Sequence, residues 1–179
     1  VRFCVVSNNF EWYKSELIFL QSKPLSVLKW HLLLILVYLI PSKKYFIYKG
    51  KKYLYKSISL GNPHAVFICK GIKKINLKNF SDQFNKKNYF KNGVNISLVE
   101  NLKNNNWLAR IYERGSGETK SCGSAACAIS VCTKFLNSSS INYVHMDGGK
   151  AKVKWSGKEL DPIYLIGSSE YVFQGIFTI

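Results

Sequence analysis

The sequence predicts an α+β fold, because many short apolar runs with strand-like patterns surround only two segments with helical patterns. The first helical segment spans residues 76–88 and places Leu77, Phe80 and Phe84 on one face. The second spans residues 125–135, is rich in alanine and contains neither Gly nor Pro. The 179 residues are enough for one or two small domains, and their apolar share of 47% is typical of a globular protein.

The other apolar runs are predicted strands, separated by Gly, Pro and Asn residues. Lys49-Gly50-Lys51 joins one strand pair, and Asp147-Gly148-Gly149 closes a hairpin whose second strand alternates cleanly. Pro41-Ser42 ends the most apolar of the early strands, and we place a domain boundary there. In chain order, we expect strands at residues 16–21, 25–30, 31–40, 45–48, 52–60, 64–68, 93–99, 107–112, 141–146, 150–155, 163–166 and 171–179.

The net charge of +16 suggests a nucleic-acid partner, but the distribution of the charge argues against one. The basic residues are almost all Lys, with Arg only at positions 2, 110 and 114, and they are scattered between apolar positions. Heavy use of Lys, Asn and Ile is typical of an AT-rich genome. We therefore expect no nucleic-acid partner, although a basic surface attracts polyanions weakly.

Cysteine usage and the lengths of the apolar runs predict a cytoplasmic protein. Five cysteines are an odd number without a pairwise spacing pattern, which favours a reducing compartment. The first residues show no signal-peptide pattern. The apolar run at residues 32–40 is far shorter than the ~20 residues that span a bilayer, so we interpret it as a buried strand and expect no membrane association.

The stretch at residues 112–135 carries the strongest chemical signal. A predicted strand leads into it, Gly115-Ser116-Gly117 interrupts it, and Cys122 stands where the second helix begins. Free backbone N–H groups and the helix dipole favour an anion at that point, so we expect a lowered pKa for the Cys122 thiol. The same N–H groups can hold a substrate carboxylate. Glu113-Arg114 adds an acid and a guanidinium just upstream, which we expect to act as a charge pair.

A structural role is the alternative for each cysteine. Cysteine is most often a small buried apolar side chain, and Cys127 and Cys132 keep that interpretation because they fall inside the predicted helix. Together with Cys122 they are spaced by five residues, whereas zinc ligands usually come in pairs two to four residues apart. We therefore expect no metal site.

Polar residues near two strand starts are further candidates for binding. Pro63 restricts Asn62 to extended geometry, so it orients the Asn62 amide and the His64 ring at the start of a buried strand. Asn95 lies among apolar residues in another strand, where a buried amide must find partners. The structural alternatives, an ordinary turn before a strand and a satisfied core amide, stay open at this point.

Six motifs together resemble diaminopimelate epimerase, from about residue 60 to the C-terminus, whereas the first sixty residues match only loosely. The most specific is YERGSGET at residues 112–119, followed closely by CGSAACA at 122–128. The others are GNPHAV (61–66), GVNI (93–96), GGKAKVKW (148–155) and EYVFQG (170–175). The resemblance implies a pseudo-symmetric two-domain fold, in which each half wraps a β-sheet round a central helix and the active site lies between the halves.

The resemblance also implies a reaction, the conversion of LL- to meso-diaminopimelate in lysine biosynthesis, without a cofactor. One cysteine thiolate takes the α-proton and a thiol on the opposite face returns one. Cys122 would be one of the two thiols. Gly123 and Ser124 would bind the reacting carboxylate through their backbone N–H groups, and Glu113 and His64 would face the reacting amino group.

Specificity would come from the distal end of the substrate. The resemblance assigns that end to Arg114, Asn62 and Asn95, with Arg114 as a bidentate carboxylate clamp. The partners implied are a small-molecule substrate, diaminopimelate, and a second copy of the chain in a homodimer.

Two departures from the family pattern stand out. The family's first thiol lies in a C-G-N-G-x-R-C-F stretch, and Val1-Arg2-Phe3-Cys4 looks like the tail of it. The first thiol would then precede residue 1, so we expect this chain alone to be impaired. Ala125 stands where the family usually has Gly, and we expect a strained loop if that position needs a conformation that only Gly adopts easily.

The resemblance divides the chain into three parts. Residues 1–41 would be a remnant of the N-terminal domain, 42–167 the C-terminal catalytic domain, and 168–179 a closing strand that returns to the N-terminal domain. Two alternative functions remain: an inactive remnant that acts as a basic binding protein, and a proline-racemase-like amino-acid racemase. Glu113-Arg114 and the GET triplet argue against the racemase.

Overall fold

The computed structural model describes residues 38–136, 139–158 and 161–168. This part of the chain forms one nine-stranded sheet with two α-helices and two short 3₁₀ helices, which confirms the α+β class. The strands are β1 (Tyr38–Tyr48), β2 (Lys51–Ser59), β3 (Pro63–Ile68), β4 (Asn95–Asn101), β5 (Asn106–Glu113), β6 (Gly117–Thr119), β7 (Ile141–Met146), β8 (Gly149–Lys154) and β9 (Tyr164–Ile166). The helices are η1 (Ile72–Lys74), α1 (Leu77–Lys86), α2 (Gly123–Thr133) and η2 (Lys134–Leu136).

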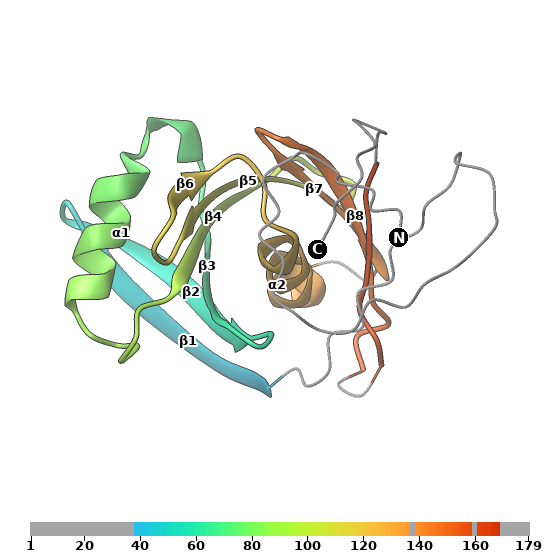
Figure 1. Ribbon diagram of the computed structural model, residues 1–179, viewed down its shortest axis with the longest axis horizontal. Helices are drawn as coiled ribbons and strands as arrows, with labels where there is room; N and C mark the ends of the chain where they lie inside the picture. The colour runs from blue at the N-terminus through green and yellow to red at the C-terminus, as the bar shows by residue number, and fades with distance from the viewer. Residues whose placement is uncertain (1–37, 137–138, 159–160, 169–179) are drawn as a thin grey trace, which may run out of the picture.

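The sheet is mixed and curves around α2, while α1 covers its outer face (Figure 1). The strand order is β1-β2-β3-β4-β5-β7-β8-β9, with β6 paired to β5. Neighbours are antiparallel except β3–β4 and β5–β7, which are parallel. A parallel pair needs a long crossover, and these two crossovers contain α1 and α2 respectively.

The inner core of the molecule is built around α2. Every residue of this helix except Ser124 is buried, as expected for a helix that is apolar on all sides. Its Gly, Ala, Ser and Cys side chains are small, so the strands can approach it closely. Two tryptophans complete this core and satisfy their indole N–H groups: Trp107 donates to Asn142 Oδ1 at 2.9 Å, and Trp155 donates to the Lys158 carbonyl at 3.1 Å.

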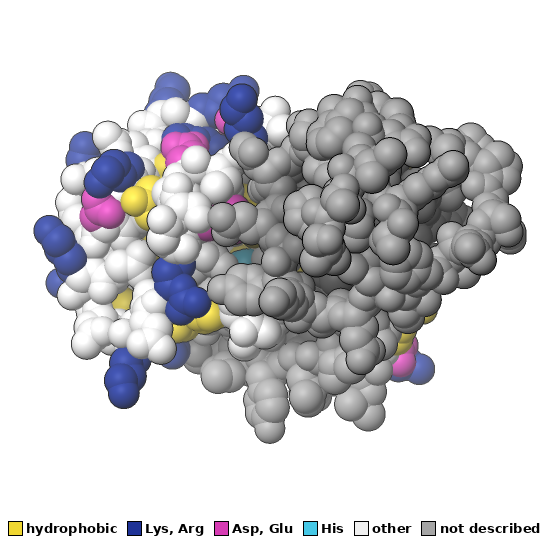
Figure 2. Space-filling view, viewed as in Figure 1, with side chains coloured by type: hydrophobic (Ala, Val, Ile, Leu, Met, Phe, Trp, Pro, Cys, Tyr) yellow, Lys and Arg dark blue, Asp and Glu magenta, His cyan; other side chains and the backbone are white. Residues whose placement is uncertain are grey.

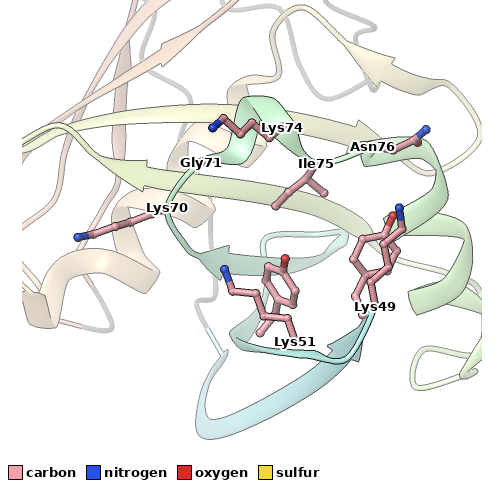
Figure 3. Close-up of a pocket in the computed structure, with 9 residues that line it drawn as sticks. Lys49, Lys51, Lys70, Gly71, Lys74, Ile75 and Asn76 are labelled. Carbon is pink, nitrogen blue, oxygen red and sulfur yellow. The ribbon is translucent and has the colours of Figure 1, made fainter.

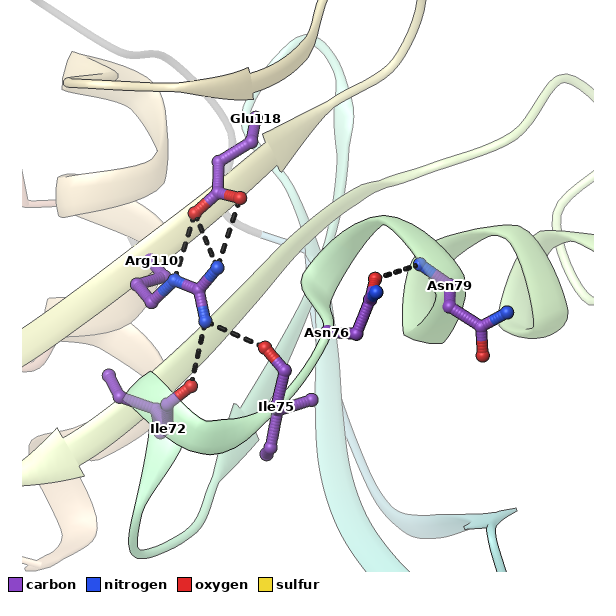
Figure 4. Close-up of polar contacts among 6 residues, drawn as sticks. All are labelled: Ile72, Ile75, Asn76, Asn79, Arg110 and Glu118. Atoms are coloured by element: carbon purple, nitrogen blue, oxygen red, sulfur yellow. Dashed lines mark hydrogen bonds and ion pairs between the residues drawn. The ribbon is translucent and has the colours of Figure 1, made fainter.

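Helix α1 begins and packs as its sequence predicts. Asn76 precedes the first turn, and its Oδ1 accepts the backbone N–H of Asn79 at 2.9 Å (Figure 4). Leu77, Phe80 and Phe84 are buried against the outer face of the sheet. The predicted apolar face of this helix is therefore confirmed.

Aromatic rings fill the outer core between α1 and strands β1–β3. The ring of Phe80 lies 4.9–5.2 Å from those of Phe46, Tyr48, Tyr53 and Phe67, mostly edge to face. Such pairs stabilise a fold by about 0.5–1.5 kcal/mol each beyond the area that they bury. Phe80 is therefore a central packing residue of this layer.

Arg110 ties three elements together at the outer face (Figure 4). From β5 it donates to both carboxylate oxygens of Glu118 in β6, at 2.8 and 3.0 Å. It also donates to the backbone carbonyls of Ile72 and Ile75 at 2.9 and 2.8 Å. A forked guanidinium is suited to such a junction, so Arg110 has a structural role here.

The structure differs from the sequence prediction near Pro41. Strand β1 runs through Pro41 instead of ending there, and its pairing with β2 shifts register between Ile40 and Lys44. The proline ring has no N–H to donate to a ladder, which accounts for an irregular segment at this point. The predicted strands at 16–21, 25–30 and 171–179, and most of 31–40, lie outside the described residues. The division into three domain parts therefore stays a prediction.

Basic side chains are scattered over the described part of the visible face and do not form one stripe (Figure 2). This agrees with the distribution of Lys along the sequence. Within the described ranges, no helix is both long enough and apolar enough to cross a membrane.

Candidate active site

Three neighbouring strands bring polar side chains to one end of the sheet. His64 in β3 pairs with Asn95 in β4. Asn95 precedes Ile96 and Glu113 follows Tyr112, and because Ile96 and Tyr112 are an antiparallel pair, Asn95 and Glu113 lie at the same end of β4 and β5. Side chains alternate along a strand, and the residues that share a face with His64, Asn95 and Glu113 belong to the inner cores around α2. All three side chains therefore lie on the α2 side of the sheet.

Cys122 is the residue that precedes the first turn of α2, as the sequence predicts. Its backbone is extended, with φ −149° and ψ 116°, and its side chain does not cap the helix. The Cys122 thiol instead donates to Glu113 Oε2 at 3.3 Å and lies 3.4 Å from Ser124 Oγ. Cys122 is 6% exposed as a residue, but its thiol has polar neighbours and is not enclosed by hydrocarbon alone.

The pKa of the Cys122 thiol is shifted in the direction opposite to our expectation. The pKa is raised from 9.0 to about 11 in total: burial is the largest cause, the Ser124 hydroxyl and the Ala125 backbone N–H oppose it, and the neighbouring Glu113 carboxylate adds to it. The prediction of a lowered pKa is therefore wrong for the protein in this state. Cys122 holds its proton at neutral pH.

Glu113 is fixed by a residue that the sequence analysis missed. Thr119 Oγ1 donates to Glu113 Oε1 at 2.6 Å, which leaves Oε2 for the Cys122 thiol. Thr119 reaches this position because residues 117–119 form β6 and fold back on β5, with Gly115 and Gly117 at positive φ in the turn. The Gly-Ser-Gly triplet before Glu-Thr was the available signal for such a hairpin.

Glu113 and Arg114 do not pair with each other in this structure. Strand alternation sends Glu113 towards α2, whereas the Arg114 guanidinium is exposed and donates to the Asn92 carbonyl at 3.0 Å. Asn95 Oδ1 accepts the backbone N–H of Arg114 at 2.8 Å. The expected charge pair does not form; instead, the Asn95 amide binds the backbone N–H that links Glu113 to Arg114.

The Asn62 amide and the His64 ring, on either side of Pro63, contact each other, which the sequence did not predict. His64 Nε2 lies 3.0 Å from Asn62 Oδ1, and the ring is fully buried. Burial lowers the pKa of His64 from 6.5 to about 4, so the imidazole is neutral at physiological pH. His64 Nδ1 has no partner within the described part of the protein, and no hydrogen bond there joins this pair to Cys122 or Glu113.

The first turn of α2 leaves donors available beside the thiol. The first intrahelical bond runs from the Ala126 N–H to the Cys122 carbonyl at 3.0 Å, so the N–H groups of Gly123 and Ser124 precede the hydrogen-bonded ladder. Ala125 lies inside the helix with an ordinary negative φ, and it packs against Cys122 and Ile111. The conditional expectation of strain at Ala125 is therefore wrong.

The arrangement combines a protonated thiol, a fixed carboxylate, a neutral imidazole and free N–H groups at a helix start. Such a set can deliver a proton to a carbon while the N–H groups stabilise developing negative charge. The structure brings Cys122 into direct contact with Glu113 and Ser124, and it places His64 and Asn95 on adjacent strands with Asn62 in the turn before β3. Arg114 lies at the same sheet end but points outward. Neither of the two hollows found on the described part of the protein, one of which is drawn in Figure 3, is lined by any of these residues.

A curved sheet round a buried helix, with a thiol that donates to a carboxylate at the helix start, is an arrangement suited to proton transfer. The sequence comparisons make this specific. A family model described as diaminopimelate epimerase matches residues 56–172, which is more than half of the chain. The chain belongs to the diaminopimelate epimerase family, and the resemblance noted in its motifs is confirmed.

Curated relatives with the same name cover the C-terminal part of the chain. The diaminopimelate epimerase of Buchnera aphidicola (subsp. Acyrthosiphon pisum, strain 5A) is 37% identical over 125 residues, 68% of this chain and 43% of that protein. The protein of Blochmanniella floridana is 34% identical over 68% of this chain and 45% of that protein. The chain thus spans less than half the length of these relatives.

Among solved structures, a PhzF-family phenazine biosynthesis protein from Bacillus anthracis is similar at 16% identity, with a TM-score of 0.48 over 70% of this chain and 48% of that one.

Proposed function

We propose that this chain forms the half of a diaminopimelate epimerase that carries one of its two reacting thiols. The observation that carries the proposal is the contact of the Cys122 thiol with Glu113 at the start of α2. It is supported by the family match and by the names of the curated relatives. The substrate is diaminopimelate, the reaction needs no cofactor, and it belongs to lysine biosynthesis.

The protonation state of Cys122 suggests its part in the reaction. A thiol with a pKa of about 11 is the proton donor, so the thiolate that takes the α-proton belongs to a second cysteine on the other face of the substrate. The Cα–H bond breaks towards that thiolate, and a new Cα–H bond forms with the proton of Cys122. Cys122 ends as a thiolate beside the N–H groups of Gly123 and Ser124, which also hold the reacting carboxylate.

Glu113 and His64 face the reacting amino group in this scheme. The substrate ammonium adds positive charge beside the Glu113 carboxylate and offsets the effect by which Glu113 raises the pKa of Cys122. The neutral His64 ring offers a hydrogen bond there without adding charge of its own. Substrate binding would therefore bring the Cys122 thiol closer to the acidity that proton transfer requires.

Arg114, Asn62 and Asn95 are proposed to bind the distal end of diaminopimelate. The exposed Arg114 guanidinium uses one nitrogen for the Asn92 carbonyl and has further N–H groups for a carboxylate. The amide oxygens of Asn62 and Asn95 are engaged by His64 and by the Arg114 backbone, so their NH₂ groups would do the binding.

The test uses the 179-residue chain with LL- and meso-diaminopimelate in heavy water. Cys69 lies beyond the far end of β3 and Cys127 and Cys132 lie within the core of α2, so among the described cysteines Cys122 alone occupies the start of α2. In the reverse of the proposed step, the Cys122 thiolate takes the α-proton on its own face and returns a deuteron, so we expect slow deuterium uptake at Cα on that face, measured by NMR, without epimerisation at a rate typical of the family. The uptake is lost in Cys122→Ala and kept in the matched control Cys132→Ala.

Two outcomes would overturn parts of this proposal. Uptake that persists in Cys122→Ala removes Cys122 from the reaction, and rapid formation of the second isomer by this chain shows that it already contains both thiols. No uptake at all, in a folded chain, favours the alternative of an inactive binding protein. A homodimer, a cytoplasmic location and the absence of membrane or nucleic-acid partners remain part of the proposal.

A further inference from the structure

A lysine-lined hollow lies on the outer face of the sheet, away from the candidate active site (Figure 3). It has a volume of about 340 Å³ and opens between the β1–β2 turn and the loop that leads from β3 into η1. The β1–β2 turn is at the opposite end of β2 from the Gly61-Asn62-Pro63 turn. At about 3.3 Å per residue, the two ends of this nine-residue strand are roughly 25–30 Å apart, so the hollow is not part of the substrate site.

Four lysines line this hollow, and none of them pairs with a carboxylate among the described residues. Lys49 and Lys51 come from the hairpin on one side, and Lys70 and Lys74 come from the loop and η1 on the other (Figure 3). No Asp or Glu lines the hollow, and the ion pairs found among the described residues involve other side chains. Glu100, an acid next to this loop, accepts hydrogen bonds from the backbone N–H groups of Gly71 and Ile72 at 2.9 and 3.3 Å.

Two tyrosines form an apolar wall of the same hollow. The rings of Tyr48 and Tyr53 are almost fully buried and pack in the outer core, so this wall is rigid. The ammonium of Lys49 lies 5.7 Å from the Tyr48 ring centre, and that of Lys51 lies 5.4 Å from the Tyr53 ring centre. These cation–π contacts hold two of the four charges at the edge of the hollow without neutralising them.

Unpaired like charges around one concavity repel one another, and a bound polyanion removes that repulsion. The hollow is much larger than a single phosphate needs, and its rim combines cations with aromatic edges. The four lysines come from two separate segments that border one hollow and do not follow a single strand or helix, which fits a compact ligand better than a nucleic-acid strand. We propose that this hollow binds a small polyphosphate, either an inorganic triphosphate or a nucleoside triphosphate.

The experiment measures binding of inorganic triphosphate and of ATP to the 179-residue chain by calorimetry, at about 0.15 M salt, where the Debye length is near 8 Å. The test variant is the double substitution Lys51→Gln, Lys74→Gln, which removes one charge from each side of the hollow. The matched control is Lys150→Gln, Lys154→Gln, which removes two exposed charges from β8. Circular dichroism verifies that all three proteins are folded.

We expect the test variant to weaken binding at least tenfold and the control to change it less than threefold. ATP that binds more tightly than inorganic triphosphate indicates that the tyrosine wall contacts the nucleoside, and equal affinities indicate recognition of the phosphate chain alone; both support the site. Equal weakening by the two double variants would show general attraction to a chain of charge +16 and would overturn the proposal. The absence of binding at millimolar ligand would also overturn it. So would single-stranded DNA that binds more tightly than either ligand, with its affinity reduced equally in both double variants.

Discussion

Replacing Glu113 with Gln should lower the pKa of Cys122 below its value of about 11. The Glu113 carboxylate lies 3.3 Å from the thiol and opposes its ionisation, whereas a glutamine amide has the same shape and no charge. At an effective dielectric constant of about 20, two charges at this distance repel by about 5 kcal/mol. If a quarter to a half of that survives relaxation and rearrangement, the pKa falls by about one to two units, since 1.36 kcal/mol corresponds to one unit.

The consequence is measurable as thiolate content. With a pKa of about 11, roughly one Cys122 in 10,000 is ionised at pH 7, and the substitution should raise this fraction by about 10- to 100-fold. The assay is a pH titration of the cysteine ¹³Cβ chemical shift, with the signal assigned by Cys122→Ser. This measurement needs no reagent to reach the thiol, which matters because Cys122 is only 6% exposed.

Glu118→Gln is the matched control for this measurement. It makes the same chemical change at the residue directly before Thr119, but Glu118 is paired with Arg110 on the outer face. We expect its effect on the pKa of Cys122 to be below about 0.3 units. An unchanged or raised pKa in Glu113→Gln, or an equal fall in both variants, would refute the role assigned to the carboxylate.

Three further substitutions test the surroundings of the site and the core. Thr119→Val should cost about 1–2 kcal/mol in urea unfolding by removing a hydrogen bond to the charged Glu113, and Thr119→Ser should retain it; equal losses in both would contradict this. The pKa of His64 is lowered to about 4, so between pH 6.5 and 4 the unfolded chain binds a proton that the folded chain does not. Stability that is present above pH 6.5 is therefore lost as the pH falls towards 4, by about 3 kcal/mol. His64→Gln should flatten the pH dependence of the unfolding free energy in this range, and an unchanged slope would count against the assignment. Phe80→Ala should cost about 3–5 kcal/mol in chemical denaturation, whereas Phe135→Ala, at a ring that is 70% exposed, should cost less than about 0.5 kcal/mol, and similar losses would argue against the aromatic core.

Periodicity and turn residues predicted most of the described elements. Helix α1 was visible from its apolar face and Asn76, and α2 from its alanine content, because both signals are local. Strand β6 was missed because it has three residues and is polar, and η1 because a single turn has no periodicity to detect. The course of β1 through Pro41 was missed because sheet pairing outweighs the local effect of a proline at an irregular position.

The composition of the candidate site was predictable, but its contacts were not. Motif resemblance indicated Cys122, Glu113 and Asn95, and the structure places them together on adjacent elements. That Glu113 contacts the thiol while Arg114 points away follows from the parity of the strand and from the register of β5 against β4. Register is a property of the assembled sheet, so a motif that contains two adjacent charged residues does not reveal that they lie on opposite faces.

The protonation state of Cys122 shows why a local signal gave the wrong sign. A helix start stabilises an anion by about 0.3–1 kcal/mol at an exposed site and by up to about 2 kcal/mol when partly buried. The rise of the Cys122 pKa from 9.0 to about 11 corresponds to about 2.7 kcal/mol in the opposite direction, after the Ser124 hydroxyl and the Ala125 N–H have already acted. Enclosure by the curved sheet therefore outweighs the helix start. The Cys122 thiol ionises more readily only when its burial is reduced or when the charge of the neighbouring Glu113 carboxylate is neutralised. An ammonium group bound at Glu113 would neutralise that charge without opening the fold.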